Sequence, residues 1–517
     1  MNEHPVLPSQ PLTESEIDER FASLQAGLAD HWTRIKELNT SEQTIVVVPS
    51  ISLEFDIPAT VLQAYEERFL FILLLLRQPR ARMIYVTSRP VSEDLVDYFL
   101  GLLPGVIARH ARKRLQLIAT GDGSARPLTE KLLARPRVIA SIADTIEDRS
   151  RAHLVPFNTT PMEKELAVRL GIPMFACDPV HDHHGSKTGS RRIFDATDVQ
   201  YPIGADDLGG RDDLLAALTK LRAAKPELAS VVIKLDESVS GEGNAVLDLD
   251  GLPAPGSDDE QSALEERLGA IRPEQAGCDA ETFLANLAER RGIVEERIVG
   301  DDFRSPSVQL RITPVGEVQV LSTHDQLLGG PSGQSYIGCR FPADPEYALT
   351  LAASGRRIGE HLAREGVLGR FAVDFVTVRK PDESWDVHAI EINLRKGGTT
   401  HPYLTLEFLT SGRYDAEAGL FKAPNGRSKF YVADDHVEDP SFQQLTPDDV
   451  FDFAVCSGLH FDHSLRTGIV WHLLSCITQH GRLGLTAVGN TPEEAEALRQ
   501  RAIEGLRAEA QRVSRGG

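Results

Sequence analysis

The chain has 517 residues, which is long for a single hydrophobic core and predicts three or four domains. Its 55 Lys and Arg residues against 76 Asp and Glu residues give a formal net charge of −21, which opposes binding to nucleic-acid phosphates or anionic lipid, so neither partner is expected. Five widely spaced cysteines without a Cys-x-x-Cys pair, and an N-terminus without a basic and apolar leader, predict a cytoplasmic protein with reduced thiols.

Residues 1–180 alternate segments of helical and strand character. Helices are predicted over residues 14–38 and 61–76. Apolar segments predict strands at residues 44–48, 83–87, 137–141 and 171–177. Strands separated by helices predict an open α/β unit with a parallel sheet and helices on its faces. No Gly-x-Gly-x-x-Gly follows any of these strands, so a dinucleotide site is not predicted.

Two lysines in the next region are candidates for binding phosphate. Lys187 lies in a stretch of small residues that predicts a loop, directly after the histidines of residues 181–184, which we interpret as a solvated loop rather than a metal site. Lys234 interrupts the apolar strand of residues 230–235, where a buried ammonium group needs an anionic partner. The turn that follows can close its backbone N–H groups over a polyphosphate, and it comprises Ser240, Gly241, Glu242, Gly243 and Asn244.

A second ligand-binding pattern follows a predicted helix over residues 279–291. The extended segment of residues 293–303 offers backbone donors and acceptors to an adenine edge, and an acid a few residues later can bind ribose hydroxyls. A hairpin is predicted over residues 307–322, followed by a long polar, glycine-rich loop over residues 323–334 that is expected to contact a ligand. The intervening residues 250–277 are rich in Pro, Gly and acid and predict an exposed excursion.

Three oxygen-bearing side chains indicate a divalent cation. Glu391 and Asn393 lie two apart on a predicted strand, so both side chains leave the same face. Asp374 interrupts the apolar strand of residues 370–376 and lies beside them if the two strands pair as a hairpin. Carboxylate and amide oxygens held side by side suit Mg²⁺, with Mn²⁺ as an alternative. The region after residue 427 predicts two capped helices, and its histidines are interpreted as structural.

The order of these motifs resembles the ATP-grasp superfamily over about residues 185–405. The resemblance implies an α/β protein with α+β lobes that enclose ATP. Its expected units are an N-terminal Rossmann-like open α/β domain (1–180), a small lobe (181–305), a large lobe (306–426) and a C-terminal accessory α+β domain (427–517).

The resemblance also implies roles for individual residues. ATP would be bound by the lysines, the small-residue turn, the hinge strand and a ribose-binding acid: Lys187, Lys234, Ser240, Gly241, Glu242, Gly243, Asn244, Glu295, Glu296, Ile298 and Asp302. The metal would be held by Asp374, Glu391 and Asn393. The arginine that D-alanine:D-alanine ligase carries two residues before the metal acid is replaced here by Ala372. Catalytic cations are therefore assigned to Arg395, Lys396, Arg311 and Arg370.

Residues 322–326, 391–402 and 481–489 resemble the pheganomycin-type peptide ligase family. This resemblance spans most of the chain and implies an ATP-dependent, ADP-forming carboxylate–amine ligase that makes an amide bond through an acyl phosphate. It would join an amino acid or guanidino acid to a peptide amine in antibiotic biosynthesis. Positions expected to contact the substrate are His324, Gln326, Gln334 and His401.

Two other functions stay open at this point. One is an ATP-dependent carboxylase or phosphotransferase on the same scaffold, and the other is a nucleotide-binding module without turnover. Retention of three metal ligands argues against a silent module. The expected partners are a small-molecule carboxylate and a peptide or amino-acid amine. A homodimer is left open, and the sequence does not name either substrate.

Overall fold

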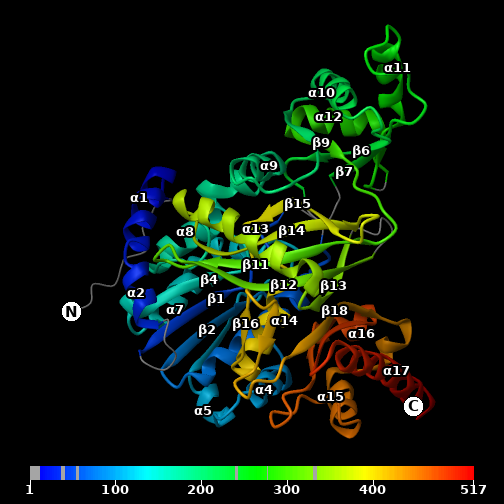
Figure 1. Ribbon diagram of the computed structural model, residues 1–517. Helices are drawn as coiled ribbons and strands as arrows, with labels where there is room; N and C mark the ends of the chain where they lie inside the picture. The colour runs from blue at the N-terminus through cyan, green and yellow to red at the C-terminus, as the bar shows by residue number, and fades with distance from the viewer. Residues whose placement is uncertain are drawn as a thin grey trace.

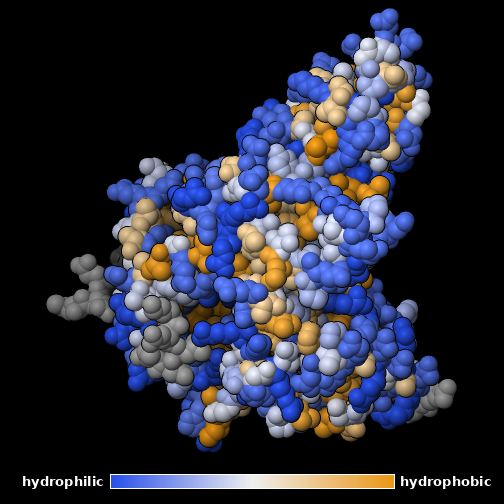
Figure 2. Space-filling view, in the orientation of Figure 1, coloured by the Kyte–Doolittle hydropathy of each residue, from blue (hydrophilic) through white to orange (hydrophobic). Residues whose placement is uncertain are grey.

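The computed structural model describes residues 12–35, 41–53, 57–238, 243–275, 277–329 and 335–516, whose strands form four sheets. Figure 1 shows the N-terminal α/β unit (blue to cyan) and the C-terminal helices (orange to red) below a central sheet, with a small lobe (green) standing out at the top right. The surface of the same face is largely hydrophilic (Figure 2). None of the described helices is long and apolar enough to cross a lipid bilayer.

The N-terminal sheet is parallel throughout, in the order β3-β2-β1-β4. Its strands are β1 (Gln43–Val48), β2 (Ala81–Thr87), β3 (Leu115–Ala119) and β4 (Ala152–Pro156). Val46 and Val48 belong to one hydrophobic core and Ile45 and Val47 to another, because alternate side chains along a strand leave opposite faces. Both faces are therefore buried, which confirms the predicted parallel α/β sheet.

Helices cover each face of this sheet. On one face lie α1 (Glu14–Gln25), α6 (Leu128–Leu133), α7 (Pro136–Thr145) and α8 (Pro161–Leu170). On the other lie α3 (Ala59–Arg68), the 3₁₀ segment η1 (Phe69–Arg77), α4 (Glu93–Gly101) and α5 (Ala108–Arg112). Helix α2 (Leu28–Ile35) follows α1 after a break, so the predicted continuous helix over residues 14–38 was wrong.

Two predicted strands of this unit were also wrong. Residues 137–141 lie inside helix α7, where Ile139, Ile142 and Ala143 are buried at helical spacing. The short run was ambiguous because five residues fit either a helical or a strand period. Residues 171–177 contribute only a single β-bridge, from Met174 to Leu154. The remaining two strands of the sheet are β3 and β4, neither of which the sequence analysis predicted.

The small lobe is an antiparallel sheet in the order β5-β9-β6-β7-β8. Its strands are β5 (Gly204–Leu208), β6 (Ser230–Leu235), β7 (Asn244–Asp248), β8 (Arg272–Pro273) and β9 (Gly292–Glu296). Helices α10 (Arg211–Ala224), α11 (Glu260–Arg267) and α12 (Ala280–Arg290) share its core. The predicted N-cap of α12 is confirmed, because the Asp279 side chain accepts from the Thr282 N–H at 2.8 Å.

A nine-stranded sheet forms the centre of the molecule, in the order β10-β14-β11-β12-β13-β18-β20-β19 with β15 paired to β14. Its strands are β10 (Phe303–Arg304), β11 (Pro306–Ile312), β12 (Val318–Gly329), β13 (Ser335–Phe341), β14 (Gly369–Arg379), β15 (Trp385–Asn393), β18 (Phe430–Glu438), β19 (Gly468–His472) and β20 (Arg482–Gly489). The last three come from the C-terminal region, so the sheet crosses the predicted domain boundary at residue 427.

Helices α13 (Pro345–Arg364) and α14 (Thr400–Thr410) pack beside this sheet, with α15 (Pro447–Cys456), α16 (Ile477–His480) and α17 (Pro492–Gly516) at its C-terminal end. Strands β16 (Arg413–Asp415) and β17 (Leu420–Lys422) form a separate two-stranded sheet. The predicted loop over residues 323–334 was wrong as far as Gly329, because β12 continues through it and pairs with β13. Residues 330–334 lie outside the described part of the chain.

Candidate functional site

A cleft of about 670 Å³ lies between the small lobe and the β14–β15 hairpin. The predicted phosphate lysines line it from β6 and from the start of helix α9 (Lys187–Ala196), a segment predicted as a loop. The predicted metal ligands line it from the hairpin. The residues that meet here are Lys187, Lys234, Asp374, Glu391 and Asn393. Lysines from one lobe and acids from the other therefore face a single cavity.

Strand pairing brings the three oxygen-bearing side chains together. Asp374 pairs directly with Glu391, and Ala372 pairs with Asn393, so all three leave the same face of the hairpin. Asn393 Nδ2 donates to Asp374 Oδ2 at 2.8 Å, and Gln326 Nε2 donates to Oδ1 at 2.6 Å. The predicted pairing of the two strands is confirmed.

Two partly buried carboxylates on one face, Asp374 and Glu391, repel each other. Burial, and then the charge of Glu391, raises the pKa of Asp374 to about 7. Burial also acts to raise the pKa of Glu391, but the charges of Lys187 and Lys234 leave it below its ordinary value. A divalent cation would relieve the repulsion, and the side chains offer hard oxygen atoms. The residues present therefore fit Mg²⁺ or Mn²⁺.

Both lysines are paired with acids inside the cleft. Lys187 Nζ lies 2.7 Å from Glu391 Oε1 and donates to the Ser238 carbonyl at 3.2 Å, so it connects the two lobes. Lys234 Nζ lies 2.5 Å from Glu295 Oε1. A buried ammonium group needs such a partner, as expected for Lys234. Each lysine can exchange its carboxylate for a phosphate oxygen without moving into water.

The hinge segment, residues 295–298, comprises the end of β9 and the two residues after it, and it also faces the cleft. Glu295, Glu296 and Ile298 all line it. The side chains of the two acids are held in ion pairs, Glu295 with Arg191 at 3.2 Å and Glu296 with Lys225 at 2.6 Å. Their carboxylates are therefore directed by basic side chains of the small lobe.

The chain matches one named ligase over most of its length and the model of one ATP-grasp family over its middle part. L-propargylglycine–L-glutamate ligase of Streptantibioticus cattleyicolor is 30% identical over 451 residues, which cover 85% of this chain and 88% of that protein. The sequence model of the IQCH-like ATP-grasp family matches residues 178–268 and 278–417, and that of the PGM1 C-terminal domain matches residues 449–502. The chain belongs to the ATP-grasp superfamily.

Two further known proteins are similar to the chain at lower sequence identity. IQ motif-containing protein H of Danio rerio is 24% identical over 506 residues, covering 88% of this chain but 47% of that protein, so the chain spans about half of its length. The crystal structure of the ADP complex of purK, N5-carboxyaminoimidazole ribonucleotide synthetase, has a TM-score of 0.50 at 9% identity and covers 92% of this chain and 98% of that chain. The second likeness concerns the fold alone.

Two of the described residues that were predicted to bind nucleotide, Asp302 and Gly243, lie outside the lining of the ATP-grasp cleft. Asp302 forms ion pairs with Arg304 at 3.0 Å and with Arg379 at 3.2 Å, on the outer side of β14. Its charge is therefore taken up by arginines, and its position does not support the predicted ribose contact. In the small-residue turn, Asn244 lines the cleft and Gly243 precedes β7, whereas Ser240, Gly241 and Glu242 lie outside the described residues.

Of the four predicted catalytic cations, Arg395 alone lines the cleft. The Lys396 side chain turns the other way and donates to the Pro156 carbonyl at 2.5 Å. Arg370 precedes Asp374 by four residues on β14. Its side chain therefore leaves the same face of the strand but about 13 Å away. Arg311 pairs with Arg370 across the strands and donates to Gln319 at 3.0 Å. The placement corrects the prediction for Lys396, Arg311 and Arg370.

Of the residues predicted to contact the substrate, some line the cleft and others do not. Gln326 lines the cleft and touches Asp374. His324 is buried behind it, 2.7 Å from the Tyr431 hydroxyl, and burial lowers its pKa to about 3. His401 lies in a buried cluster beside the cleft, and Gln334 lies outside the described residues.

One end of the ATP-grasp cleft is built from residues that sequence reasoning missed. They come from α3, from β13 and from β18 and are Tyr65, Arg68, Tyr336, Asp435 and His436. No motif marks these residues, because they are scattered over most of the chain and meet only through packing of the N-terminal unit and the C-terminal strands on the central sheet. At this end of the cleft, Arg68 and Asp435 form a buried ion pair with their charged atoms 2.5 Å apart.

Proposed function

We propose that the protein is an ATP-dependent, ADP-forming ligase that joins a carboxylate to an amine through an acyl phosphate. The observation that carries the proposal is the convergence of Lys187, Lys234 and the Asp374–Glu391–Asn393 group on one cleft. A carboxylate is a poor electrophile because its charge repels an amine, and phosphorylation removes that charge. Amide formation then needs only release of phosphate, so no nucleophilic side chain is required.

Each group of cleft residues has a part in this reaction. Lys187 and Lys234 bind phosphate oxygens once nucleotide replaces their acidic partners, and Arg395 stabilises charge on the transferred phosphoryl group. The hinge of Glu295, Glu296 and Ile298 binds the adenine through backbone groups. Asp374, Glu391 and Asn393 hold Mg²⁺ or Mn²⁺, which neutralises phosphate charge when bound.

The substrates are proposed at the level of chemical class. The S. cattleyicolor relative is named for joining two amino acids, and this favours an amino acid as carboxylate and an amino acid or short peptide as amine. The scattered residues at the end of the cleft, including Arg68 and Tyr336, would contact them. Division into four units at residues 180, 305 and 426, a homodimer and a cytoplasmic location stay predictions from the sequence.

Product stoichiometry tests the function. Purified protein is screened with ATP, Mg²⁺ and mixtures of amino acids and short peptides, and ADP release is followed by product mass. A ligase releases ADP at full rate only with both carboxylate and amine and yields an amide. Phosphate retained on the product indicates a phosphotransferase, carbon dioxide incorporation indicates a carboxylase, and no release under any mixture indicates a binding module.

A matched pair of variants links the activity to the cleft. Glu391→Gln removes a charge that holds the cation and should lower kcat by at least about 100-fold. Glu360→Gln changes an exposed acid on α13 and should leave kcat unchanged. Comparable rates in the two variants contradict the metal assignment.

A further inference from the structure

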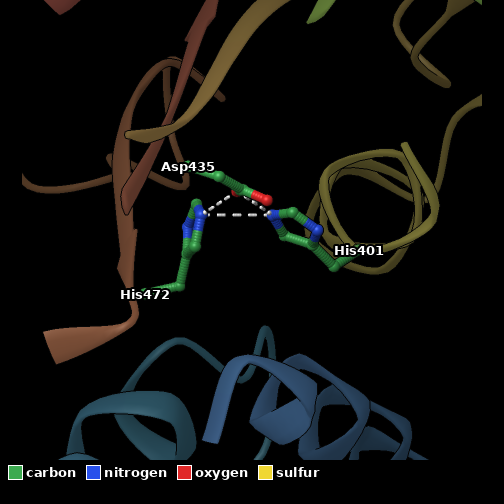
Figure 3. Close-up of side chains that lie close together, drawn as sticks. All are labelled: His401, Asp435 and His472. Atoms are coloured by element: carbon green, nitrogen blue, oxygen red, sulfur yellow. Dashed lines mark hydrogen bonds and ion pairs between the residues drawn. The ribbon is translucent and has the colours of Figure 1, made fainter. Parts of the chain in front are cut away.

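A buried cluster beside the cleft joins three elements that are distant in sequence (Figure 3). His401 lies on α14, Asp435 on β18 and His472 on β19, with relative exposures of 4%, 2% and 5%. Figure 3 shows both imidazoles directing Nε2 at the same carboxylate. Gly484 lies opposite His472 on β20, where any side chain would overlap the imidazole ring. The proposed ligase reaction uses neither histidine.

The three ligand atoms form a compact triangle. The Nε2 atoms of His401 and His472 are 3.2 Å apart. Asp435 Oδ1 lies 2.8 Å from His472 Nε2 and 3.4 Å from His401 Nε2. Around a tetrahedral zinc ion, with bonds of about 2.0–2.1 Å, neighbouring ligand atoms are about 3.3 Å apart. The triangle therefore has the size of one face of a tetrahedral site, with a fourth position left for water or another ligand.

Hydrogen bonds within the protein leave His401 incompletely satisfied. If Nε2 carries the proton, the lone pair of Nδ1 is buried without a well-formed hydrogen bond to any described residue. If Nδ1 carries it, beside the Gly398 backbone, the lone pair of Nε2 faces the Asp435 carboxylate, and His472 Nε2, 3.2 Å away, has to share one N–H between that lone pair and Asp435. Either arrangement costs free energy, because a buried polar atom without a partner has lost its hydration. A cation at the centre of the triangle accepts the lone pairs of both imidazoles.

Arg68 decides which oxygen of Asp435 faces the histidines. Its Nη1 lies 2.5 Å from Oδ2, which leaves Oδ1 for the imidazoles. The guanidinium and the carboxylate cancel in charge, so a divalent ion brings the group to +2, the same as a zinc ion held by three neutral histidines. The arginine therefore does not exclude a cation. It acts as an outer partner that orients a ligand.

We propose that His401, His472 and Asp435 bind a divalent transition-metal ion of the zinc type. Imidazole nitrogens favour such an ion, whereas the oxygen atoms of the cleft favour Mg²⁺, so the two sites select different metals. The bound ion connects helix α14, which follows the metal-ligand strand β15, to the C-terminal strands of the central sheet. It holds the end of the cleft that Asp435 and Arg68 line.

Metal titration of the full-length protein tests the site. After treatment with EDTA and return to buffer containing Mg²⁺, the protein should bind one equivalent of Zn²⁺ by calorimetry. His472→Asn should weaken this binding at least about 100-fold, more than the loss of an outer partner costs. Co²⁺ as a probe should give the visible absorption of a four-coordinate site in the original protein and not in His472→Asn.

Two controls separate this site from other metal binding. His463→Asn changes an exposed histidine of the same region and should leave Zn²⁺ affinity unchanged. Glu391→Gln should retain the Zn²⁺ equivalent while losing ligase activity, so the outcome is independent of the proposed function. If His472→Asn does not fold by circular dichroism, His401→Asn replaces it, and the Co²⁺ spectrum of the original protein is decisive alone. No Zn²⁺ uptake by the stripped protein, or a Zn²⁺ affinity of His472→Asn or His401→Asn equal to that of the original protein, overturns the proposal.

Discussion

At the scale of single residues, the lysines of the cleft form ion pairs with acidic side chains. Lys187 is held by Glu391 and Lys234 by Glu295, at 2.7 and 2.5 Å. Such pairs avoid the large free-energy cost of an unpaired buried charge. They also keep each ammonium group in place, so that binding a phosphate exchanges one anion for another. This arrangement predicts that the lysines matter more for nucleotide affinity than for folding.

Lys234→Ala should therefore weaken ATP binding by about 10- to 100-fold, the value of a charge-assisted hydrogen bond in a buried site. Glu295 retains Arg191 as a partner, so the fold should persist. Calorimetry with ATP and Mg²⁺ gives the affinity. Lys220→Ala, an exposed position on α10, is the matched control. Equal affinities in the two variants would exclude the phosphate role.

Glu67 on α3 gives a prediction for pH. Burial, with a smaller contribution from Glu66, raises its pKa to about 7 from an ordinary value of 4.5. The folded protein therefore keeps a proton that the unfolded chain releases between these pH values, and stability falls as pH rises through this window. The loss reaches about 3 kcal/mol above pH 7.

Glu67→Gln removes this contribution. Urea midpoints measured at pH 5 and pH 8 should fall less in the variant than in the original protein, because glutamine does not titrate. Other buried acids, such as Asp374, change both proteins equally and cancel in the comparison. An identical fall in both proteins would show that Glu67 is ionised in the folded state.

At the scale of elements, local signals and long-range pairing act together. Helix α15 begins at a capping box in which Thr446 accepts from the Asp449 N–H and Asp449 accepts from the Thr446 N–H. The hairpin of β14 and β15 has a local turn at residues 380–384, but the register that places Asp374 opposite Glu391 extends over both strands. The first kind of element depends on a few neighbouring residues, the second on the whole sheet.

Thr446→Ala should destabilise the start of α15 by about 1 kcal/mol, because the side-chain oxygen that caps the helix is lost. Hydrogen exchange of residues 447–456, followed by mass spectrometry, should then be about fivefold faster. Thr219→Ala, at an exposed position inside α10, serves as the control and should change exchange little. Unchanged exchange in Thr446→Ala would mean that packing, not the cap, limits opening of this helix.

At the scale of the whole molecule, the N-terminal and C-terminal regions share one core. A single cluster contains Leu73 and Leu74 of η1, Leu406 of α14, and Leu483 and Leu485 of β20. Strand β18 pairs with β13 on one side and β20 on the other. The C-terminal region is therefore part of the sheet that carries the metal ligands, and not an appendage to it.

A chain ending at residue 426 should consequently fail to fold. It loses β18 and β20 and so exposes both the edge of β13 and the apolar side chains of η1 and α14 that share a core with β20. We expect aggregation during expression and no cooperative thermal transition. A soluble fragment that unfolds cooperatively and binds ATP would show that the large lobe is independent of the C-terminal strands.

Much of the site could be read from short-range patterns. Lysine in an apolar strand, two polar residues with one between them, and capping residues before helices each depend on neighbours within a few positions. Such spacing predicts Lys234, Glu391, Asn393 and the caps at Asp279 and Thr446, because strand and helix geometry alone sets which side chains share a face.

Other features depended on contacts between residues far apart in the chain. Residues 137–141 form a helix because their apolar side chains meet the sheet at helical spacing, which five residues cannot reveal. Lys396 points away from the cleft because it donates a hydrogen bond to the Pro156 carbonyl. The cluster of His401, Asp435 and His472 has no sequence pattern, since its members are brought together by the order of strands in the sheet and by the packing of α14. The spacing of residues in the sequence indicates which side chains share a face of a helix or strand. Where a side chain points is decided by the distant elements that pack against it.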